Sequence, residues 1–249
     1  MKITYKLFIA TLLTSALIAC DKPLTIAPQF VCYYYHRADT IPGTADYHES
    51  SWQVYRDIEC PQPINDTWAK IHDSVFAFAL CDSTRCRKND LKVLYEYPPV
   101  VVKDTESTYA YNHNDYISLR TYHISDSLYG FYCHTKWYDM GCHGSEGYYY
   151  RYFNTQTGDL LTVADIVTSV APLTNYLDSA VRQSERAWGI LTDTVRPNNN
   201  FIIFDEGLTF VYNQYEIACF AADTFMCLVP LAKFQPCLKG NYSYLWNNQ

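Results

Sequence analysis

Three strand-like segments, joined by short turns, constrain the fold of this 249-residue chain more than any other feature. They run from Tyr116 to Ile124, from Leu128 to Tyr138 and from Gly147 to Asn154. Segments of this length rich in aromatic and β-branched residues are typical of strands, and short connections favour antiparallel neighbours. The sequence therefore predicts an antiparallel meander in the middle of the chain.

Further strands flank this meander in the sequence. They are predicted from Trp52 to Cys60, from Leu91 to Tyr97 and from Thr224 to Val229, and Phe201–Phe204 with Leu208–Tyr212 is typical of a hairpin. Together with the helices described next, hairpin-paired strands predict an α+β fold with antiparallel sheets and lateral helices.

Helix signals occur at four places. Asn65 or Asp66 can cap a helix, and its apolar stripe consists of Ile64, Trp68, Ile71, Val75 and Phe78. Pro172 can occupy the first turn of a second helix, and its apolar side consists of Leu173, Tyr176, Leu177, Ala180, Val181, Ala187 and Trp188. The pattern Thr162-x-x-Asp165 is a capping box for a short helix. Pro230 can open a final helix from Leu231 to Leu238.

The first twenty residues resemble a bacterial lipoprotein signal. Lys2 and Lys6 give a positive start, and the apolar stretch from Leu7 to Ile18 is shorter than the roughly 20 residues that a membrane-spanning helix needs. The stretch ends in Leu17-Ile18-Ala19-Cys20, which resembles a lipobox. We expect cleavage before Cys20, a palmitate-type acyl anchor on that residue, and a mature protein in the cell envelope on the outer side of the cytoplasmic membrane.

The charge balance restricts the class of partner. After Ala19 the chain has 17 basic and 26 acidic residues, a formal net charge of −9. An acidic chain without a basic run is a poor binder of nucleic acid. A cationic protein is an electrostatically easier partner.

Ten cysteines are typical of an exported protein. Cys81 and Cys86 bracket a short polar loop, and Cys133 and Cys142 bracket a turn, so each pair is a candidate local disulfide. With Cys20 acylated, nine thiols remain, and one of them cannot pair within the chain. The other cysteines cannot be paired from the sequence.

The chain also has 24 tyrosines, some of them in runs such as Tyr33-Tyr34-Tyr35 and Tyr148-Tyr149-Tyr150. Such runs can form surfaces on which sugars stack. Because consecutive strand residues alternate between faces, however, each run is expected to place some rings in a core and others on a wet sheet face.

Three ordered segments between Gly141 and the C-terminus resemble a known family. Gly158-Asp159-Leu160-Leu161-Thr162-Val163-Ala164-Asp165-Ile166 is similar to its segment tGk-l-t-l-sDlf. Met140-Gly141-Cys142-His143 is similar to its Gly-Gly-Ala-His turn, and the stretch from Phe201 to Leu231 is similar to its later hairpin and strand. The family is the extracellular domain of the RsiV-type lysozyme-responsive anti-sigma factors, which also precedes the catalytic domain of PdaC-type peptidoglycan deacetylases.

The resemblance implies a sensor-type module without a catalytic domain. Together with the N-terminal signal, it gives four expected parts: a signal peptide (1–19), a lipid-anchored tether (20–48), an N-terminal α+β subdomain (49–140) and a C-terminal domain of this family (141–249). The chain departs from the family at Met140 and Cys142, at Cys219 in place of Pro, and at Asp223 in place of Gly. These departures place any shared binding surface near those loops in doubt.

Two groups of residues are candidates for a site. Cys133-His134 and Cys142-His143 are ligand types that zinc accepts. Neighbouring strand residues face opposite ways, however, so we expect no metal there. His143 could act as a general base, or it could bond local backbone. In the second group, Tyr215-Glu216-Ile217, Glu216 could be an acid with a raised pKa, or it could accept N–H bonds that fix a turn.

The sequence thus predicts a cell-envelope lipoprotein that binds a ligand and uses no cofactor. The expected ligand is a lysozyme-like protein or a peptidoglycan or other glycan fragment, with His143, Tyr215 and Glu216 as binding residues. The alternative is a small envelope hydrolase that uses His143 or Glu216. Such an enzyme requires two or more catalytic groups that converge in a cleft.

Overall fold

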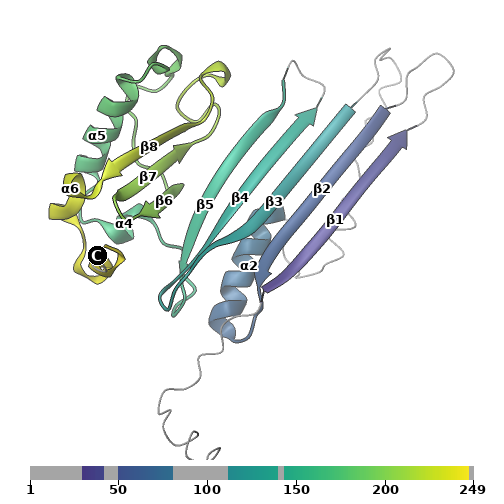
Figure 1. Ribbon diagram of the computed structural model, residues 1–249, viewed down its shortest axis with the longest axis horizontal. Helices are drawn as coiled ribbons and strands as arrows, with labels where there is room; N and C mark the ends of the chain where they lie inside the picture. The colour runs from purple at the N-terminus through teal and green to yellow at the C-terminus, as the bar shows by residue number, and fades with distance from the viewer. Residues whose placement is uncertain (1–29, 42–49, 81–111, 140–142, 247–249) are drawn as a thin grey trace, which may run out of the picture.

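The computed structural model describes residues 30–41, 50–80, 112–139 and 143–246, and it consists of two β-sheets that lie side by side (Figure 1). The larger sheet has five strands in chain order. They are β1 (Phe30–Ile41), β2 (Ser50–Pro61), β3 (Asn112–Ile124), β4 (Leu128–Asp139) and β5 (Ser145–Asn154).

The predicted meander forms β3, β4 and β5, which pair antiparallel. β1 and β2 also pair antiparallel, whereas β2 and β3 are parallel. A parallel pair needs a long crossover, often through a helix, and α2 (Asp66–Leu80) lies between these two strands in the chain. The larger sheet is therefore antiparallel except between β2 and β3.

The segment 20–48, expected to be a tether, contains strand β1. β1 pairs with β2 along its whole length, from Phe30 opposite Pro61 to Ile41 opposite Ser50. The prolines that flank this strand, Pro28 and Pro42, lie outside it. The strand residues between them can therefore all take part in pairing.

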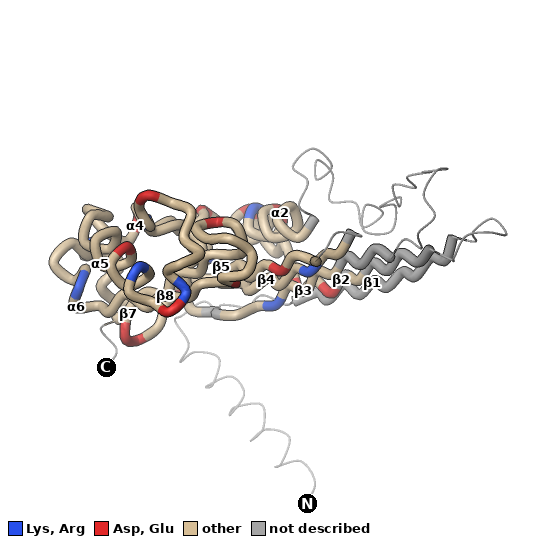
Figure 2. Tube along the Cα trace, turned by 90° about the horizontal axis from the view of Figure 1, so that it is seen from above, with Lys and Arg blue, Asp and Glu red and all other residues tan. Residues whose placement is uncertain are grey.

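Helix α2 covers one face of the larger sheet and forms a core with it (Figure 2). The side-chain Oδ1 of Asn65 accepts the backbone N–H of Trp68 at 2.9 Å, so Asn65 is the cap. Of the predicted stripe, Trp68, Ile71 and Val75 are buried, whereas Ile64 is exposed.

The smaller sheet consists of β6 (Phe201–Phe204), β7 (Gly207–Tyr212) and β8 (Phe225–Pro230), all antiparallel. Its helices are α4 (Val163–Ile166), α5 (Ala171–Arg182) and α6 (Leu231–Phe234). Four short 3-10 helices complete this part: η1 (Ala187–Gly189), η2 (Phe220–Ala222), η3 (Gln235–Cys237) and η4 (Gly240–Leu245). The predicted hairpin is formed by β6 and β7.

Helix α5 is shorter than predicted. Leu173, Leu177 and Val181 are buried as expected, and each contributes roughly 1.5–3 kcal/mol through burial. The helix ends at Arg182, and in the turn that follows the Ser184 hydroxyl donates to the Val181 carbonyl at 2.7 Å. Trp188 therefore lies outside the helix with 68% of its surface exposed, contrary to the prediction.

The two short helices also differ in part from expectation. The backbone N–H of Thr162 donates to Asp165 Oδ2 at 2.8 Å, so the capping box predicted for α4 is present. The final helix is divided: α6 ends at Phe234, and a 3-10 turn that contains Pro236 follows. Proline lacks the N–H that a continuing helix requires.

The two sheets share one of the two cores. Leu128 of β4 and Tyr152 of β5 pack with the buried residues of the smaller sheet, and the Tyr152 hydroxyl accepts the Ile203 N–H at 3.1 Å. The boundary expected after residue 140 falls between β4 and β5, whereas the division between the two sheets in the structure follows Asn154.

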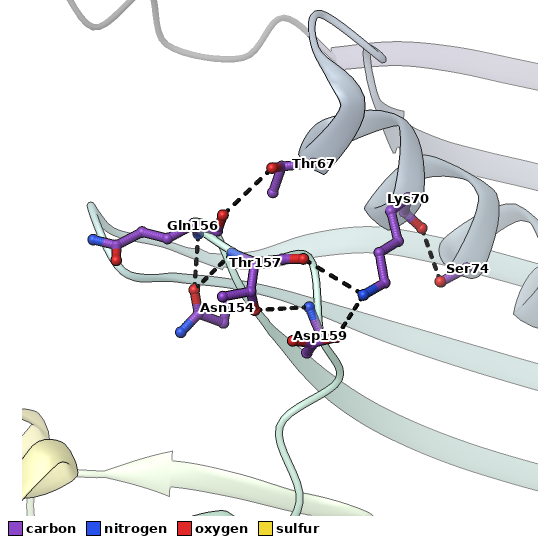
Figure 3. Close-up of polar contacts among 7 residues, drawn as sticks. All are labelled: Thr67, Lys70, Ser74, Asn154, Gln156, Thr157 and Asp159. Atoms are coloured by element: carbon purple, nitrogen blue, oxygen red, sulfur yellow. Dashed lines mark hydrogen bonds and ion pairs between the residues drawn. The ribbon is translucent and has the colours of Figure 1, made fainter.

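A polar latch joins α2 to the turn after β5 (Figure 3). Lys70 Nζ donates to the carbonyl oxygen of Thr157 and forms an ion pair with Asp159, and the Thr67 hydroxyl donates to the carbonyl of Gln156. Because these side chains are exposed and screened by solvent, the ion pair contributes little to stability. The latch sets the position of the turn rather than the stability of the whole fold.

The structure confirms the α+β class: two mostly antiparallel sheets with helices packed on them. The predicted strand from Leu91 to Tyr97, the signal segment with Cys20, and Cys81, Cys86 and Cys142 lie outside the described residues. Within the described residues, no helix has the length and apolar character that crossing a membrane requires.

Candidate functional site

Five exposed or half-buried side chains lie on loops at one end of the smaller sheet. We call them the loop surface: His143, Trp188, Leu191, Tyr215 and Phe220. Leu191 and Trp188 have exposed fractions of 70% and 68%, and Tyr215 is 58% exposed. Large exposed side chains that gather on one surface mark an interaction site more often than scattered ones do.

The structure brings His143 and Tyr215 together, although 72 residues separate them in the sequence. The Tyr215 hydroxyl lies 3.3 Å from His143 Nε2, and His143 Nδ1 lies 3.0 Å from the Gly144 carbonyl oxygen. Because a carbonyl accepts only, Nδ1 carries the hydrogen, and a neutral His143 accepts from Tyr215. The imidazole also stacks on Phe220 with a centroid distance of 3.6 Å.

Two segments carry the loop surface and bond to each other. The Cys219 N–H donates to the Gly189 carbonyl at 2.8 Å, and the Leu191 N–H donates to the Ile217 carbonyl at 2.9 Å. Trp188 and Leu191 are therefore held beside the loop that carries Tyr215.

Tyr215 has a backbone conformation that its side chain does not favour. Its φ is +65°, in the left-handed region, where an L-residue is strained by about 1–2 kcal/mol. A bulky residue there is rare and persists only where the surroundings fix it. Strain of this kind, on an exposed aromatic residue, points to a functional role.

Glu216 supplies part of that fixation. Its Oε2 accepts the Asn213 backbone N–H at 3.0 Å, and its Oε1 accepts from Asn198 Nδ2 at 2.6 Å. The first contact closes the turn that contains Tyr215, and the second joins that turn to the segment of Asn198. This geometry agrees with the interpretation in which the Glu216 carboxylate accepts N–H bonds that fix a turn.

The same loop is fastened to the outer edge of β5 by side-chain amides. Amide oxygens accept the backbone N–H of every second residue of the strand, as another strand would. These bonds join Glu146 to Gln214 at 3.1 Å, Tyr148 to Asn213 at 2.7 Å and Tyr150 to Asn200 at 2.8 Å. They cover an edge that could otherwise pair with another chain, and they place the residues next to Tyr215 against the larger sheet.

Asp223 is the second strained residue of this loop. Its φ of +62° and ψ of −170° belong to a region that is essentially restricted to glycine. Its carboxylate Oδ1 accepts the Thr224 N–H at 2.7 Å. The sequence showed this residue only as a departure from a family glycine, and the strain explains why glycine is typical there.

A second candidate surface lies on the face of the larger sheet opposite α2. We call it the tyrosine face; it consists of Tyr55, Tyr116, Tyr122, Tyr132, His134, Tyr148 and Tyr150. The rings of Tyr148 and Tyr150 lie on this face, whereas Tyr149 packs against the core under α2. The expected division of the tyrosine run between two faces is therefore observed.

Glu146 is the polar centre at one side of the tyrosine face. Its Oε1 accepts from His134 Nε2 at 2.6 Å, from the Tyr148 hydroxyl at 2.7 Å and from Lys136 Nζ at 2.9 Å. Burial alone would raise the pKa of Glu146, but the hydrogen bonds from Lys136, Tyr148 and His134 outweigh it and lower the pKa to about 2. Glu146 therefore stays ionised at neutral pH.

The candidate zinc ligands separate as expected. Cys133 is buried in the core under α2, whereas His134 lies on the opposite face, stacked on Tyr148 with a centroid distance of 4.8 Å. The described residues contain no group of three or more His, Cys, Asp or Glu side chains that could hold a metal ion. The pairings of Cys133 with Cys142 and of Cys81 with Cys86 remain predictions.

The two side chains named for a hydrolase, His143 and Glu216, have separate hydrogen-bond partners in the structure. No hydrogen bond joins His143 to Glu216 within the part of the chain that the structure describes. Ser118 of β3 lies directly opposite His134 of β4, and His134 bonds to Glu146 of β5, so a serine, a histidine and a glutamate lie on three neighbouring strands. Among the described residues, however, no hydrogen bond joins Ser118 to His134. A nucleophile activated by a histidine requires that contact.

Comparison with known proteins identifies the C-terminal part. Residues 159–232 match a family described as "Protein of unknown function (DUF3298)", so the chain contains a DUF3298 domain. No curated protein matches the chain. A solved DUF3298 family member from Bacteroides fragilis has a similar fold, with a TM-score of 0.72 and 17% identity over 90% of this chain and 98% of that one. A DUF3298 family protein from Pseudomonas aeruginosa gives a TM-score of 0.54 and 13% identity, over 92% and 99% of the two chains.

Proposed function

We propose that this chain is a cell-envelope lipoprotein whose folded part binds a protein at the loop surface and converts no substrate. The strained, exposed Tyr215 is the observation that carries the proposal. Holding a tyrosine at φ +65° costs folding energy, and the Glu216 and amide contacts that hold it would have little purpose around a passive turn.

The composition of the loop surface favours a protein partner. Tyr and Trp are the residue types that contribute most often to protein interfaces, and Trp188, Leu191 and Tyr215 are the exposed members here. The fixed backbone at Tyr215 lowers the conformational entropy lost on binding. This is the behaviour expected of an anchor residue.

Charge favours a cationic partner. The mature chain has a formal net charge of −9, and the exposed carboxylates of Glu216 and Asp223 belong to the same loop as Tyr215. The resemblance to RsiV-type sensor domains points to a lysozyme-like protein, which is basic. Attraction of this kind increases the association rate and weakens as salt rises.

A titration with egg-white lysozyme tests the proposal. The wild-type mature domain should bind it, with an affinity that falls between 50 and 300 mM salt. Tyr215→Gly should weaken binding at least tenfold, whereas Tyr244→Ala should not, because Tyr244 is an exposed tyrosine of η4 outside the loop surface. Absence of binding, or equal affinity of Tyr215→Gly and wild type, would reject the proposal.

The rival function is a small envelope hydrolase. His143 bonds to Tyr215 and Glu216 bonds to Asn198, so each side chain already has a structural contact. Peptidoglycan cleavage by the wild-type domain that is lost in His143→Ala or Glu216→Gln, with the fold intact, would place the rival first.

The membrane anchor is tested separately. Mass spectrometry of the protein extracted from membranes should show an acylated Cys20 at the N-terminus. A free N-terminus at another residue would remove the lipoprotein part of the proposal and leave the binding part unaffected.

A further inference from the structure

The tyrosine face is a second surface, and its chemistry differs from that of the loop surface. Its rings form a continuous network across four strands. The contacts run from Tyr55 to Tyr116, from Tyr116 to His134, from His134 to Tyr148 and Tyr132, and from Tyr132 through Tyr150 to Tyr122. Rings that support one another in this way have little rotational freedom left to lose on binding.

No described helix covers this face. Figure 2 shows α2 on one side of the larger sheet only, and in Figure 1 the strands lie in front of α2. Tyr122 is 43% exposed, and the other rings of the face for which exposure is described are half-buried. The network is therefore accessible to a ligand from the side opposite α2.

Two ion pairs neutralise four of the charged groups on the tyrosine face. Asp57 and Arg120 form an ion pair, and Lys136 pairs with Glu146 at 2.9 Å. The Glu59 carboxylate accepts the Thr121 backbone N–H at 3.2 Å. A surface with paired charges neither attracts nor repels a charged polymer strongly, so it suits an uncharged ligand.

The remaining groups are hydroxyls and ring surfaces rather than aliphatic side chains. Tyr132 and Tyr150 lie opposite each other on β4 and β5 with ring centroids 5.1 Å apart, and Tyr122 meets Tyr150 edge-on at 5.5 Å. A phenol offers an apolar body and one hydroxyl that donates and accepts. A sugar has the matching combination of apolar C–H faces and hydroxyl groups.

From this geometry we infer that the tyrosine face binds an uncharged oligosaccharide, with Tyr122, Tyr132 and Tyr150 as the principal contacts. This site is separate from the loop surface and does not depend on the function proposed for that surface. A protein with both sites could hold an envelope or host glycan while it recognises a protein partner.

Titration with three uncharged hexasaccharides tests the inference: chitohexaose, cellohexaose and mannohexaose, each followed by calorimetry or by NMR shifts of tyrosine ring signals. At least one should bind with millimolar or better affinity, and the affinity should change less than twofold between 50 and 300 mM salt. In the double variant Tyr132→Phe, Tyr150→Phe the rings remain and only two hydroxyls are lost. Two lost hydrogen bonds should weaken binding roughly 5- to 100-fold.

The controls separate this site from the loop surface. Tyr244→Phe removes an exposed hydroxyl elsewhere and should leave sugar binding unchanged, as should Tyr215→Gly. Conversely, the Tyr132→Phe, Tyr150→Phe variant should keep its affinity for lysozyme. No binding of any hexasaccharide, unchanged binding in the double Phe variant, or loss of sugar binding in Tyr215→Gly would each overturn the inference.

Discussion

The strain at Tyr215 can be measured by replacing the residue with either of two small ones. Tyr215→Gly and Tyr215→Ala both remove the ring, and with it the contact with the Phe220 ring and the hydroxyl contact with His143. They differ only in the backbone, because glycine accepts φ +65° without a steric cost and alanine does not.

The expected difference follows from two opposing terms. Relief of the left-handed strain favours the glycine variant by about 1–2 kcal/mol. The greater conformational entropy of glycine in the unfolded chain lowers the stability of the glycine variant by about 0.4–1 kcal/mol. The glycine variant should therefore be more stable than the alanine variant by about 0.8 kcal/mol, within a range of about 0 to 1.6 kcal/mol. In a chain of this size that difference corresponds to roughly 1–4 °C in melting temperature.

Urea unfolding of both purified variants, monitored by tryptophan fluorescence, gives the free energies of unfolding. Equal m-values would show that both unfold to the same extent. Both variants should lose affinity for lysozyme equally, since both lack the ring. An alanine variant at least as stable as the glycine variant would show that Tyr215 is not strained, and the main support for a functional loop would be lost.

Three further changes should have measurable effects. Asp223→Gly should raise the melting temperature, because a glycine-type conformation costs aspartate about 1–3 kcal/mol and the single bond to Thr224 returns less; no rise would argue against strain there. Gly158→Ala should destabilise the fold by about 1–2 kcal/mol, since φ is +71° and a Cβ would lie 3.0 Å from the Lys70 side chain. An unchanged free energy of unfolding would show that the turn beside Lys70 can change its conformation without cost. The pKa of Glu146 is lowered to about 2, so its ionised form stabilises the fold above pH 4.5, and that stabilisation disappears as the pH falls towards 2. In Glu146→Gln the free energy of unfolding should therefore change less between pH 4.5 and 2 than in the wild type. Parallel pH profiles of the two proteins would contradict the low pKa of Glu146.

Local signals in the sequence predicted much of the fold. Asn65 caps α2, the Thr162 capping box opens α4, and the strand patterns of β3 to β7 appear at their predicted positions. Each of these features depends on residues within a few positions of one another. Helix α5 shows the limit of such signals, because the apolar pattern continues to Trp188 although the helix ends at Arg182.

Features that depend on distant contacts were not predictable in the same way. The parallel pairing of β2 with β3 depends on how the chain returns after α2. His143 and Tyr215 were each candidates, but nothing in the sequence indicated that they touch or that Tyr215 has a positive φ. The amide contacts of Asn213 with β5 exist only once both sheets are in place. A glycine expected at position 223 was the one sequence sign of strain in this loop.

Hydrogen exchange of the mature domain with and without lysozyme tests the central claim most directly. We expect slower exchange in the segments that carry the loop surface, 143–146, 188–191 and 213–223, with no change in α5 or β8. Neither protein should be cleaved over hours. Protection confined to other segments would contradict binding at the loop surface. Fragmentation of lysozyme, or of an added peptidoglycan substrate, would contradict a module that binds without turnover.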